Sequence, residues 1–500
     1  MHSVAPAQNA RSSASGTTRS TMAPRVLGVA GLLGSLVSVF GVAGGAAGAP
    51  TQYVPGRQGG WPSWLYGPLH GLGLGLGSSS FQTLTLVMCA SYVAVLLAAR
   101  ALPGKAIFAT ILAVNVVLLL GPPLISQDVF GYLAFARLGV LHGLDPYTHV
   151  AAEAPTDAVF PFIGWSFQNS PYGPLFTLGT YPLAPLGMAG GLWALKGVAV
   201  ASSLGAVALI ARAAEKMGHS AKWAAAFVGL NPVTLELAVG GAHNDALVLL
   251  VLAGALLLAA GTAPRLRGAA ALIVLGVGVK ASAGLVLPFV VLAPRHLRER
   301  VRVAGSAAAA LVLLAVVAVV GFGSHAFGFI DSLGEQQQLI ATHSIPAETA
   351  RWVGLSGLPN WWRDAFVMGF VLVALASLWR TARGADWRTM TGWTTLALLL
   401  STAWLLPWYA IWALPLAALA DSRRLRAATL VFCAYAILIH LPLADPLLSP
   451  ARHVAHSKRI ARVRVAVDGD DGVVFAGLEI VRDDPLDLRG RGVGAQTTQA

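Results

Sequence analysis

Asp128 stands at the end of a long apolar run and opens a segment rich in aromatic and small residues. If residues 128–141 are helical, Asp128, Tyr132 and Phe135 share one face of that helix. A carboxylate beside aromatic rings suits a sugar, because the carboxylate takes a hydroxyl proton while the rings stack on the apolar face of the sugar. The alternative is that Asp128 only caps the N-terminus of a helix.

A second polar cluster, His243, Asn244 and Asp245, interrupts two apolar stretches. Asn244 or Asp245 as a helix cap explains one residue of the three. A His and an Asp two positions apart can bind a divalent cation or hold a phosphate or sugar hydroxyl, and Glu236 precedes them within the apolar stretch. Two ligands are too few to assign a metal. The cluster therefore predicts ligand binding and leaves a divalent cation open as a cofactor.

Lys280 is the only Lys in the apolar segment 268–293, so its burial requires an anionic partner or a wet cavity. A lipid phosphate and Glu236 are equally good partners on this reasoning. A third possibility is that the Lys280 side chain snorkels, so that its ammonium group reaches the membrane interface. Arg351 belongs to a polar stretch that could clamp a phosphate or a glycan, although a solvated loop is the simpler interpretation.

Aromatic residues mark two further places. Tyr172 lies in a Pro-Tyr-Gly-Pro string, which is a turn signal with an aromatic residue in it. Trp408 and Tyr409 belong to the aromatic stretch 404–412, which reads equally as a membrane-interface belt or as a sugar-stacking rim. We take all these residues as candidate substrate-binding positions.

The composition defines the elements that must carry these residues. The chain has 500 residues, of which 56% are hydrophobic and only 11% are charged, whereas about a quarter are charged in soluble domains. A soluble globular enzyme is excluded, and we expect an all-α polytopic membrane protein. The net charge of +12 is explained by basic cytoplasmic loops, so the sequence gives no reason to invoke nucleic acid. Cys89 and Cys433 lie in apolar runs, which excludes a disulfide framework.

The apolar segments are separated by clusters of Arg and Lys. Several are shorter than the roughly 20 residues that a straight span requires, and broken helices are tolerated only where they line protein or a wet cavity. We expect the segment 268–293 to enter the membrane and return, breaking near Lys280. The segments are 26–49, 81–99, 106–125, 174–187, 189–211, 223–240, 246–261, 268–293, 303–323, 366–380, 390–406, 408–420 and 427–447.

The distribution of basic residues predicts the domain organisation. We expect residues 1–25 to form a cytoplasmic tail and residues 26–450 to form the transmembrane domain, whose first segment we take as an uncleaved helix rather than a signal peptide. The loops 126–172 and 324–365 are then external, with Asp128 in the first of them. Residues 451–500 form an atypical polar tail without spanning potential.

Five motifs in this order resemble those of the polyprenol-phosphate-mannose-dependent alpha-1,6-mannosyltransferases of actinobacteria, which are C-type (GT-C) membrane glycosyltransferases. The resemblance covers roughly residues 80–445. The motifs are Gln127-Asp128-Val129-Phe130-Gly131-Tyr132, Gly143-Leu144-Asp145-Pro146-Tyr147-Thr148-His149, Ser170-Pro171-Tyr172-Gly173-Pro174-Leu175, Ala242-His243-Asn244-Asp245-Ala246-Leu247 and Pro407-Trp408-Tyr409.

The resemblance implies a GT-C-like bundle of about 11–13 transmembrane or half helices, with interfacial helices in the external loops. It also implies transfer of mannose from a polyprenyl-phosphate-mannose donor to a glycolipid or mannan acceptor of the lipomannan type, at the outer face of the plasma membrane and with inversion. Asp128 matches the aspartate that acts as base in such enzymes. Lys280 or Arg351, or a metal near His243 and Asp245, would stabilise the departing phosphate.

Two other functions remain open on the sequence. A transporter or flippase of a lipid-linked sugar would also have broken helices and intramembrane charges, but it would line a path from both sides of the membrane. The unusual polar residues here gather on one side, which favours an enzyme. A GT-C transferase for another lipid-linked sugar, such as arabinose, would need the same architecture.

Overall fold

We describe a computed structural model of the chain. It describes residues 13–55, 61–441, 464–467 and 474–477, and the chain divides into two compact units, Met1–Ser449 and Pro450–Ala500. In the second unit, strands β1 (Arg464–Val467) and β2 (Val474–Gly477) pair antiparallel, with Arg464 opposite Gly477.

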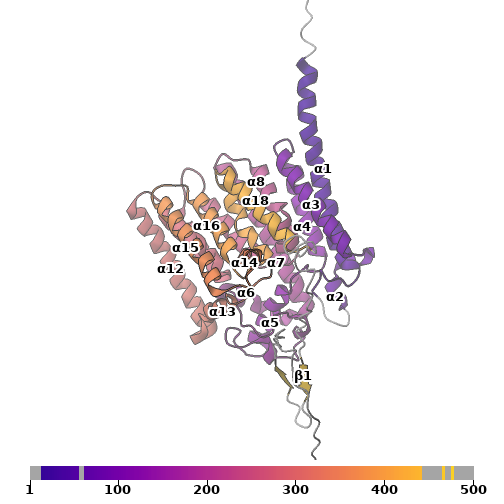
Figure 1. The fold of residues 1–500 in the computed structure, drawn as a ribbon, viewed down its shortest axis with the longest axis vertical. Helices are drawn as coiled ribbons and strands as arrows, with labels where there is room; N and C mark the ends of the chain where they lie inside the picture. The colour runs from indigo at the N-terminus through magenta and orange to yellow at the C-terminus, as the bar shows by residue number, and fades with distance from the viewer. Residues whose placement is uncertain (1–12, 56–60, 442–463, 468–473, 478–500) are drawn as a thin grey trace, which may run out of the picture. The chain divides into compact units, whose positions relative to one another are not determined.

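The described part of the first unit is helical (Figure 1). Its long, mostly apolar helices confirm the expected all-α polytopic membrane protein. Five helical stretches are long and apolar enough to cross a membrane, and they are Met22–Gly48, Ser78–Ala98, Pro174–Lys216, Leu297–His325 and Asn360–Ala382. The first of these lies in α1 (Ser13–Gly48), and the others contain α3 (Ser78–Ala98), α7 (Gly187–Lys216), α12 (Leu297–Phe322) and α15 (Asn360–Ala382).

One predicted boundary coincides with a change of backbone direction. α6 (Pro174–Thr180) and the 3₁₀ helix η4 (Tyr181–Leu186) precede Gly187, whose φ of +69° interrupts the helical backbone where α7 begins. The remaining α-helices are α2 (Ser63–Tyr66), α4 (Gly104–Leu120), α5 (Asp128–Leu141), α8 (Ala221–Gly229), α9 (Asp245–Leu258), α10 (Leu266–Val279), α11 (Leu287–Leu292), α13 (Gly328–Gln336), α14 (Ile345–Trp352), α16 (Trp387–Ser401), α17 (Leu414–Leu419) and α18 (Arg423–Leu438).

Short 3₁₀ and π-helical pieces join several of these helices. The one π-helical piece in the described residues is η5 (Val233–Val239), between α8 and α9. The 3₁₀ pieces besides η4 are η1 (Pro68–Leu72), η2 (Ala151–Glu153), η3 (Phe160–Phe162), η6 (Ala281–Val286), η7 (Gly323–His325) and η8 (Pro407–Trp412).

The segment around Lys280 breaks where the sequence predicts. α10 ends at Val279, Lys280 has an extended backbone, and η6 and α11 lead back. The backbone of the Pro-Tyr-Gly-Pro turn packs onto this break, because the Gly173 N–H donates to the Val279 carbonyl at 3.1 Å. A Cβ on Gly173 would lie 2.4 Å from the Gly278 carbonyl oxygen, so only glycine permits this close approach.

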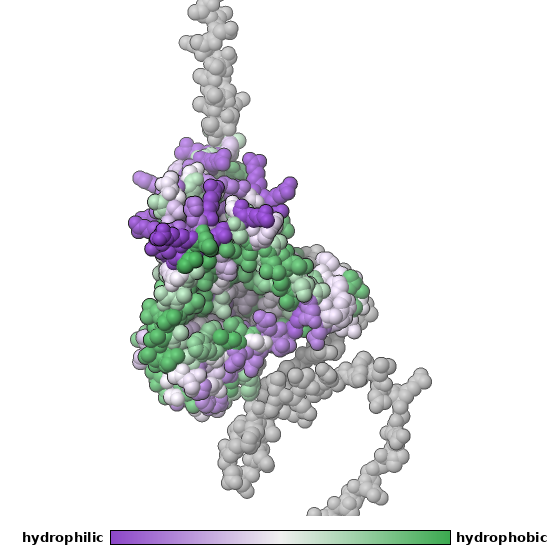
Figure 2. All heavy atoms as spheres, turned by 90° about the vertical axis from the view of Figure 1, so that its left-hand side faces the viewer, coloured by the Kyte–Doolittle hydropathy of each residue, from purple (hydrophilic) through white to green (hydrophobic). Residues whose placement is uncertain are grey.

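The basic clusters lie together at one end of the first unit. Figure 2 shows hydrophilic residues gathered at the end where α1 begins, above a hydrophobic band. Contacts between distant parts of the chain join these clusters to one another. They connect Lys222 with the Arg100 carbonyl, Arg388 with Met217, and Arg300 with the Ala382 carbonyl. α4 separates this end from Asp128, which lies beyond its far end.

Candidate active site

Asp128 is the first residue of α5 and caps nothing. Gln127 occupies the N-cap position without a side-chain cap hydrogen bond, and the Asp128 N–H donates to Ser126 Oγ at 3.1 Å. The interpretation of Asp128 as a helix cap is therefore wrong. Ile125, three residues earlier, has a φ of +75°, which is rare for a β-branched residue. Such local strain often accompanies functional sites.

His243 pairs with Asp128. Its Nε2 lies 3.6 Å from Asp128 Oδ2, and its Nδ1 lies 2.6 Å from the Leu237 carbonyl oxygen. The ring is buried and stacks on Trp408 at 3.9 Å between centroids. Burial lowers the pKa of His243, although the carboxylates of Asp128 and Asp245 oppose this effect. A neutral ring that donates from Nδ1 turns the lone pair of Nε2 toward Asp128.

Asp245 and Lys280 form an ion pair at the same site. Lys280 Nζ donates to Asp245 Oδ2 at 2.8 Å, and Trp412 Nε1 donates to Asp245 Oδ1 at 2.7 Å. The ammonium group also lies over the Tyr409 ring, 4.8 Å from its centroid. Both oxygens of a carboxylate that is 0% exposed are thus satisfied. The Lys280 ammonium group contacts Asp245, Tyr409 and Trp412, whose ring centroid lies 5.6 Å away.

The observed partner of Lys280 is not the one that the sequence offered. Glu236, offered as an alternative partner, instead accepts a hydrogen bond from Thr85 at 3.0 Å. Snorkelling is also wrong, because the Lys280 side chain is only 13% exposed and is paired with Asp245.

Tyr132 fixes α5 to the polar cluster. The Asn244 N–H donates to the Tyr132 hydroxyl at 3.2 Å, and that hydroxyl faces Asn244 Oδ1 at 3.4 Å. Its ring meets Tyr172 edge to face at 4.9 Å. Burial raises the pKa of Tyr132, and the nearby Asp128 and Asp245 add to this, so the phenol remains protonated. Tyr132 therefore lies behind the wall of the site instead of facing into it.

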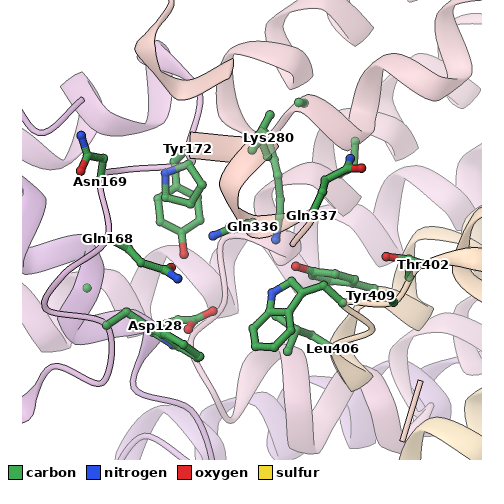
Figure 3. A pocket seen from close by; sticks show the side chains of 18 of the residues that line it. Asp128, Gln168, Asn169, Tyr172, Lys280, Gln336, Gln337, Thr402, Leu406 and Tyr409 are labelled. Carbon is green, nitrogen blue, oxygen red and sulfur yellow. The ribbon is translucent and has the colours of Figure 1, made fainter. Parts of the chain in front are cut away.

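A cavity of about 510 Å³ opens in front of these residues. Figure 3 shows the Asp128 carboxylate, the Tyr172 hydroxyl and the Lys280 ammonium group pointing into the same space, with Tyr409 at its side. Phe135 also lines this cavity, as expected from the face that it shares with Asp128.

The other predicted residues lie around or away from this cavity. Asn244, Asp245 and His243 are buried behind its wall, and Trp408 lines a neighbouring cavity. Arg351 lies elsewhere: it pairs with Glu348 at 2.5 Å and donates to the Thr342 carbonyl. The substrate-binding roles of all these residues remain predictions.

Several lining residues were not singled out in the sequence. Apolar side chains of α15 and α16 complete the wall, and polar groups come from loops, from α13, from Arg363 of α15 and from Ser401 of α16. Trp412 belongs to the aromatic stretch 404–412, which stands out in the sequence. No spacing rule in the sequence linked Trp412 to Asp245. The missed residues include Trp165, Gln168, Phe370 and Thr402.

A divalent cation has few ligands here. Within the described part of the chain, no group of three or more His, Cys, Asp or Glu side chains is placed to hold a metal ion. Asp245 is engaged by Lys280 and Trp412, and His243 Nδ1 by a backbone carbonyl.

Comparison with known proteins identifies the family. A family model described as "Alpha-(1->6)-mannopyranosyltransferase, N-terminal domain" matches residues 28–296, and one described as "MptB C-terminal domain" matches residues 359–467. The chain is 31% identical over 412 residues to alpha-(1->6)-mannopyranosyltransferase A of Mycobacterium tuberculosis, which covers 76% of this chain and 78% of that relative. The chain belongs to the alpha-(1->6)-mannopyranosyltransferase family.

Two shorter matches agree with this membership. Alpha-(1->6)-mannopyranosyltransferase A of Corynebacterium glutamicum is 31% identical over 191 residues, which is 37% of this chain and 38% of that relative. A probable alpha-(1->6)-mannopyranosyltransferase of Mycolicibacterium smegmatis is 35% identical over 162 residues, which is 29% of this chain and 27% of that relative. No solved structure matches the chain.

Membership of the alpha-(1->6)-mannopyranosyltransferase family confirms the resemblance seen in the motifs and makes this chain a glycosyltransferase of the mannosyltransferase class. Asp128, Asp245 and Lys280 lie within the first matched stretch, and Tyr409 lies within the second. Arg351 falls between the two matches.

Proposed function

We propose that this mannosyltransferase transfers mannose from a polyprenyl-phosphate-mannose donor to an alpha-1,6-mannan acceptor of the lipomannan type. The observation that carries the proposal is that Asp128 and Lys280 line one cavity. Transfer from a sugar phosphate needs a group that takes the acceptor proton and a cation that stabilises the leaving phosphate. A carboxylate and an ammonium group in one cavity meet both needs.

The walls of the cavity support a lipid-borne donor. Beyond the polar residues, the lining includes Leu285 of η6, Val367 and Phe370 of α15, and Leu398 of α16. These helices are apolar, and α15 is long enough to cross a membrane. A polyprenyl chain can therefore lie along this wall while its phosphate meets Lys280.

The transfer step follows from these positions. The C6 hydroxyl oxygen of the acceptor attacks C1 of the donor mannose, and its proton passes to the Asp128 carboxylate. The bond between C1 and the phosphate oxygen breaks, and its electron pair leaves with the polyprenyl phosphate beside Lys280. Displacement from the opposite side inverts C1, so a beta-linked donor gives an alpha-linked product. His243, 3.6 Å from Asp128, is the next acceptor available to the proton.

The charge distribution supports an outward-facing site. Basic residues of a membrane protein are enriched in its cytoplasmic connections. The basic clusters of this chain lie at one end of the first unit, whereas Asp128 lies beyond the far end of α4. We infer a multi-pass protein of the plasma membrane, with residues 1–25 in the cytoplasm and the cavity at the outer face.

The experiment compares wild type, Asp128→Asn and Asp331→Asn in membranes. Each is incubated with radiolabelled polyprenyl-phosphate-mannose and a short alpha-1,6-mannoside, and the label entering the glycan is followed. Asp331 is an exposed carboxylate of α13 outside the cavity lining, so its variant is the matched control. We expect the Asp128 variant to lose about 100-fold or more of the rate, the low end of what a positioned acid or base contributes.

Two outcomes would contradict the proposal. Full transfer by an equally abundant Asp128→Asn protein would remove the carboxylate from the chemistry. Absence of transfer by wild type, with transfer appearing when another polyprenyl-phosphate sugar is supplied, would assign a different donor.

A further inference from the structure

A second cavity, of about 420 Å³, adjoins the first and takes no part in donor binding as described above. Its volume lies within the range of small-molecule sites, about 300–1,000 Å³. Three tryptophans and three uncharged polar residues account for much of its lining. They are Trp165, Trp404, Trp408, Gln52, Ser126 and Gln127.

Asp128 lines both cavities. Trp165 and Trp404 also border both, and they meet edge to face at 5.5 Å between centroids. A ligand in the smaller cavity would therefore reach the same carboxylate as a donor in the larger one. This is the geometry that a reaction between two substrates requires.

The two linings differ in chemistry. The larger cavity has Lys280 and apolar helix walls, whereas no Lys or Arg is among the described residues that line the smaller one. Indole rings present flat apolar faces, and amide and hydroxyl groups supply hydrogen bonds between them. A neutral sugar chain, with apolar ring faces and a rim of hydroxyls, matches this lining, and a phosphate or a lipid tail does not.

Trp408 supplies a second, independent observation. Its side chain is buried, at 7% exposure, and its indole nitrogen has no hydrogen-bond partner among the described residues. A buried N–H without a partner costs free energy, and a ligand oxygen can satisfy it. Trp408 is held in place by its stacking on His243, the residue beside Asp128.

We propose that the smaller cavity binds the end of the alpha-1,6-linked mannoside acceptor and presents its hydroxyl to Asp128. This inference rests on the proposed transferase function and adds to it the place and chemistry of acceptor binding. Trp165 and Trp404 are binding residues for the sugar, and Asp128 is the point at which the two substrates meet.

The test measures initial rates with purified full-length protein, varying the mannoside at fixed donor and then the donor at fixed mannoside. Trp404→Ala and Trp165→Ala are expected to raise the KM for the mannoside about tenfold each, because ring stacking is lost. Their donor KM should change less than their mannoside KM, because Lys280 and the apolar helix walls of the larger cavity remain in place. The Trp→Phe variants should recover most of the loss, since a flat ring remains.

Two further variants distinguish binding in the smaller cavity from binding in the larger one. Gln52 is exposed and lines only the smaller cavity, so Gln52→Trp fills its mouth and should raise the mannoside KM alone. Trp379, which is 57% exposed on α15 and stacks on Arg383, gives the matched control Trp379→Ala, with unchanged constants.

The outcomes distinguish the two proposals. If wild type transfers mannose but none of these variants changes the mannoside KM, the acceptor binds elsewhere and this inference is wrong. If the donor KM rises instead, the tryptophans serve the donor. If wild type transfers no mannose to any acceptor, the proposed function itself fails.

Discussion

Replacing Lys280 by Met tests whether this residue serves the substrate or only the fold. Lys280 Nζ lies 2.8 Å from Asp245 Oδ2, and Asp245 is fully buried. At an effective dielectric constant of about 20, two unit charges at this distance attract each other by roughly 6 kcal/mol. The desolvation of both ions offsets much of this attraction. Removal of one partner nevertheless leaves an uncompensated buried charge, which costs about 3–5 kcal/mol.

Lys280→Met should therefore lower the Tm sharply, whatever the residue does in catalysis. Asp245→Asn in the same chain removes the stranded charge, while its amide oxygen still accepts from Trp412. We expect the double variant Lys280→Met/Asp245→Asn to recover most of the Tm. If Lys280 holds the donor phosphate, the double variant folds but has a much lower kcat/KM for the donor.

The assay combines thermal unfolding in detergent with initial-rate kinetics for wild type, both single variants and the double variant. Lys216→Met, an exposed lysine at the basic end of α7, controls for loss of a positive charge. A double variant with wild-type Tm and wild-type donor kinetics would refute the phosphate-binding role and leave Lys280 as a structural partner of Asp245.

Three further predictions concern residues behind the cavity. Thr85→Val removes the hydrogen bond to the buried Glu236 and should lower stability by about 1–3 kcal/mol, as measured by thermal unfolding. Adding Glu236→Gln to the Thr85→Val variant should restore part of the lost stability. Burial lowers the pKa of His243, so below about pH 6.5 the unfolded chain binds more protons than the folded chain. The free energy of unfolding therefore decreases as the pH is lowered. His243→Gln should flatten the fall in Tm between pH 7 and pH 5. Ala242 has a φ of +53°, so Ala242→Gly should raise stability by up to about 1 kcal/mol, whereas Ala238→Gly in η5 should lower it.

The fold was largely predictable because hydrophobic length and basic clusters are local properties of the sequence. The break at Lys280 was predictable for the same reason, since a charge between glycines cannot continue an apolar helix without a partner. The boundary between 174–187 and α7 was predictable as well, because Pro185 and Gly187 are local signals for a break. Gly187 has a φ of +69° at the point where η4 ends and α7 begins.

The site was only partly predictable, because partners that are distant in sequence decide it. The sequence singled out both Lys280 and Asp245 but could not pair them, since 35 residues separate the two along the chain. Tyr132 shares a helix face with Asp128 in the sequence, but the link to Asn244 turns it behind the wall. Arg351 has the right charge for a phosphate, and only the structure shows that it pairs with Glu348 and does not line the cavity.

The lengths of the helices that meet at the ion pair predict that it lies below the membrane surface. α9 begins at Asp245 and α10 ends at Val279, beside Lys280, and each has 14 residues. Fourteen residues of α-helix span about 21 Å, whereas the hydrocarbon core is about 30 Å thick. If these helices start at the membrane face that carries the basic clusters, Lys280 lies several ångströms inside the opposite face.

A recessed ammonium group has a functional consequence. A donor phosphate that reaches Lys280 must leave the bulk water, and electrostatic interactions are stronger where water is scarce. The same depth limits access of water to the reacting carbon, so the acceptor hydroxyl at Asp128 has an advantage over hydrolysis. Substitutions that widen the cavity without removing its charges, such as Phe370→Ala in the apolar wall, should therefore increase release of free mannose relative to transfer. Equal ratios of free mannose to transferred mannose in this variant and in wild type would show that depth does not exclude water here.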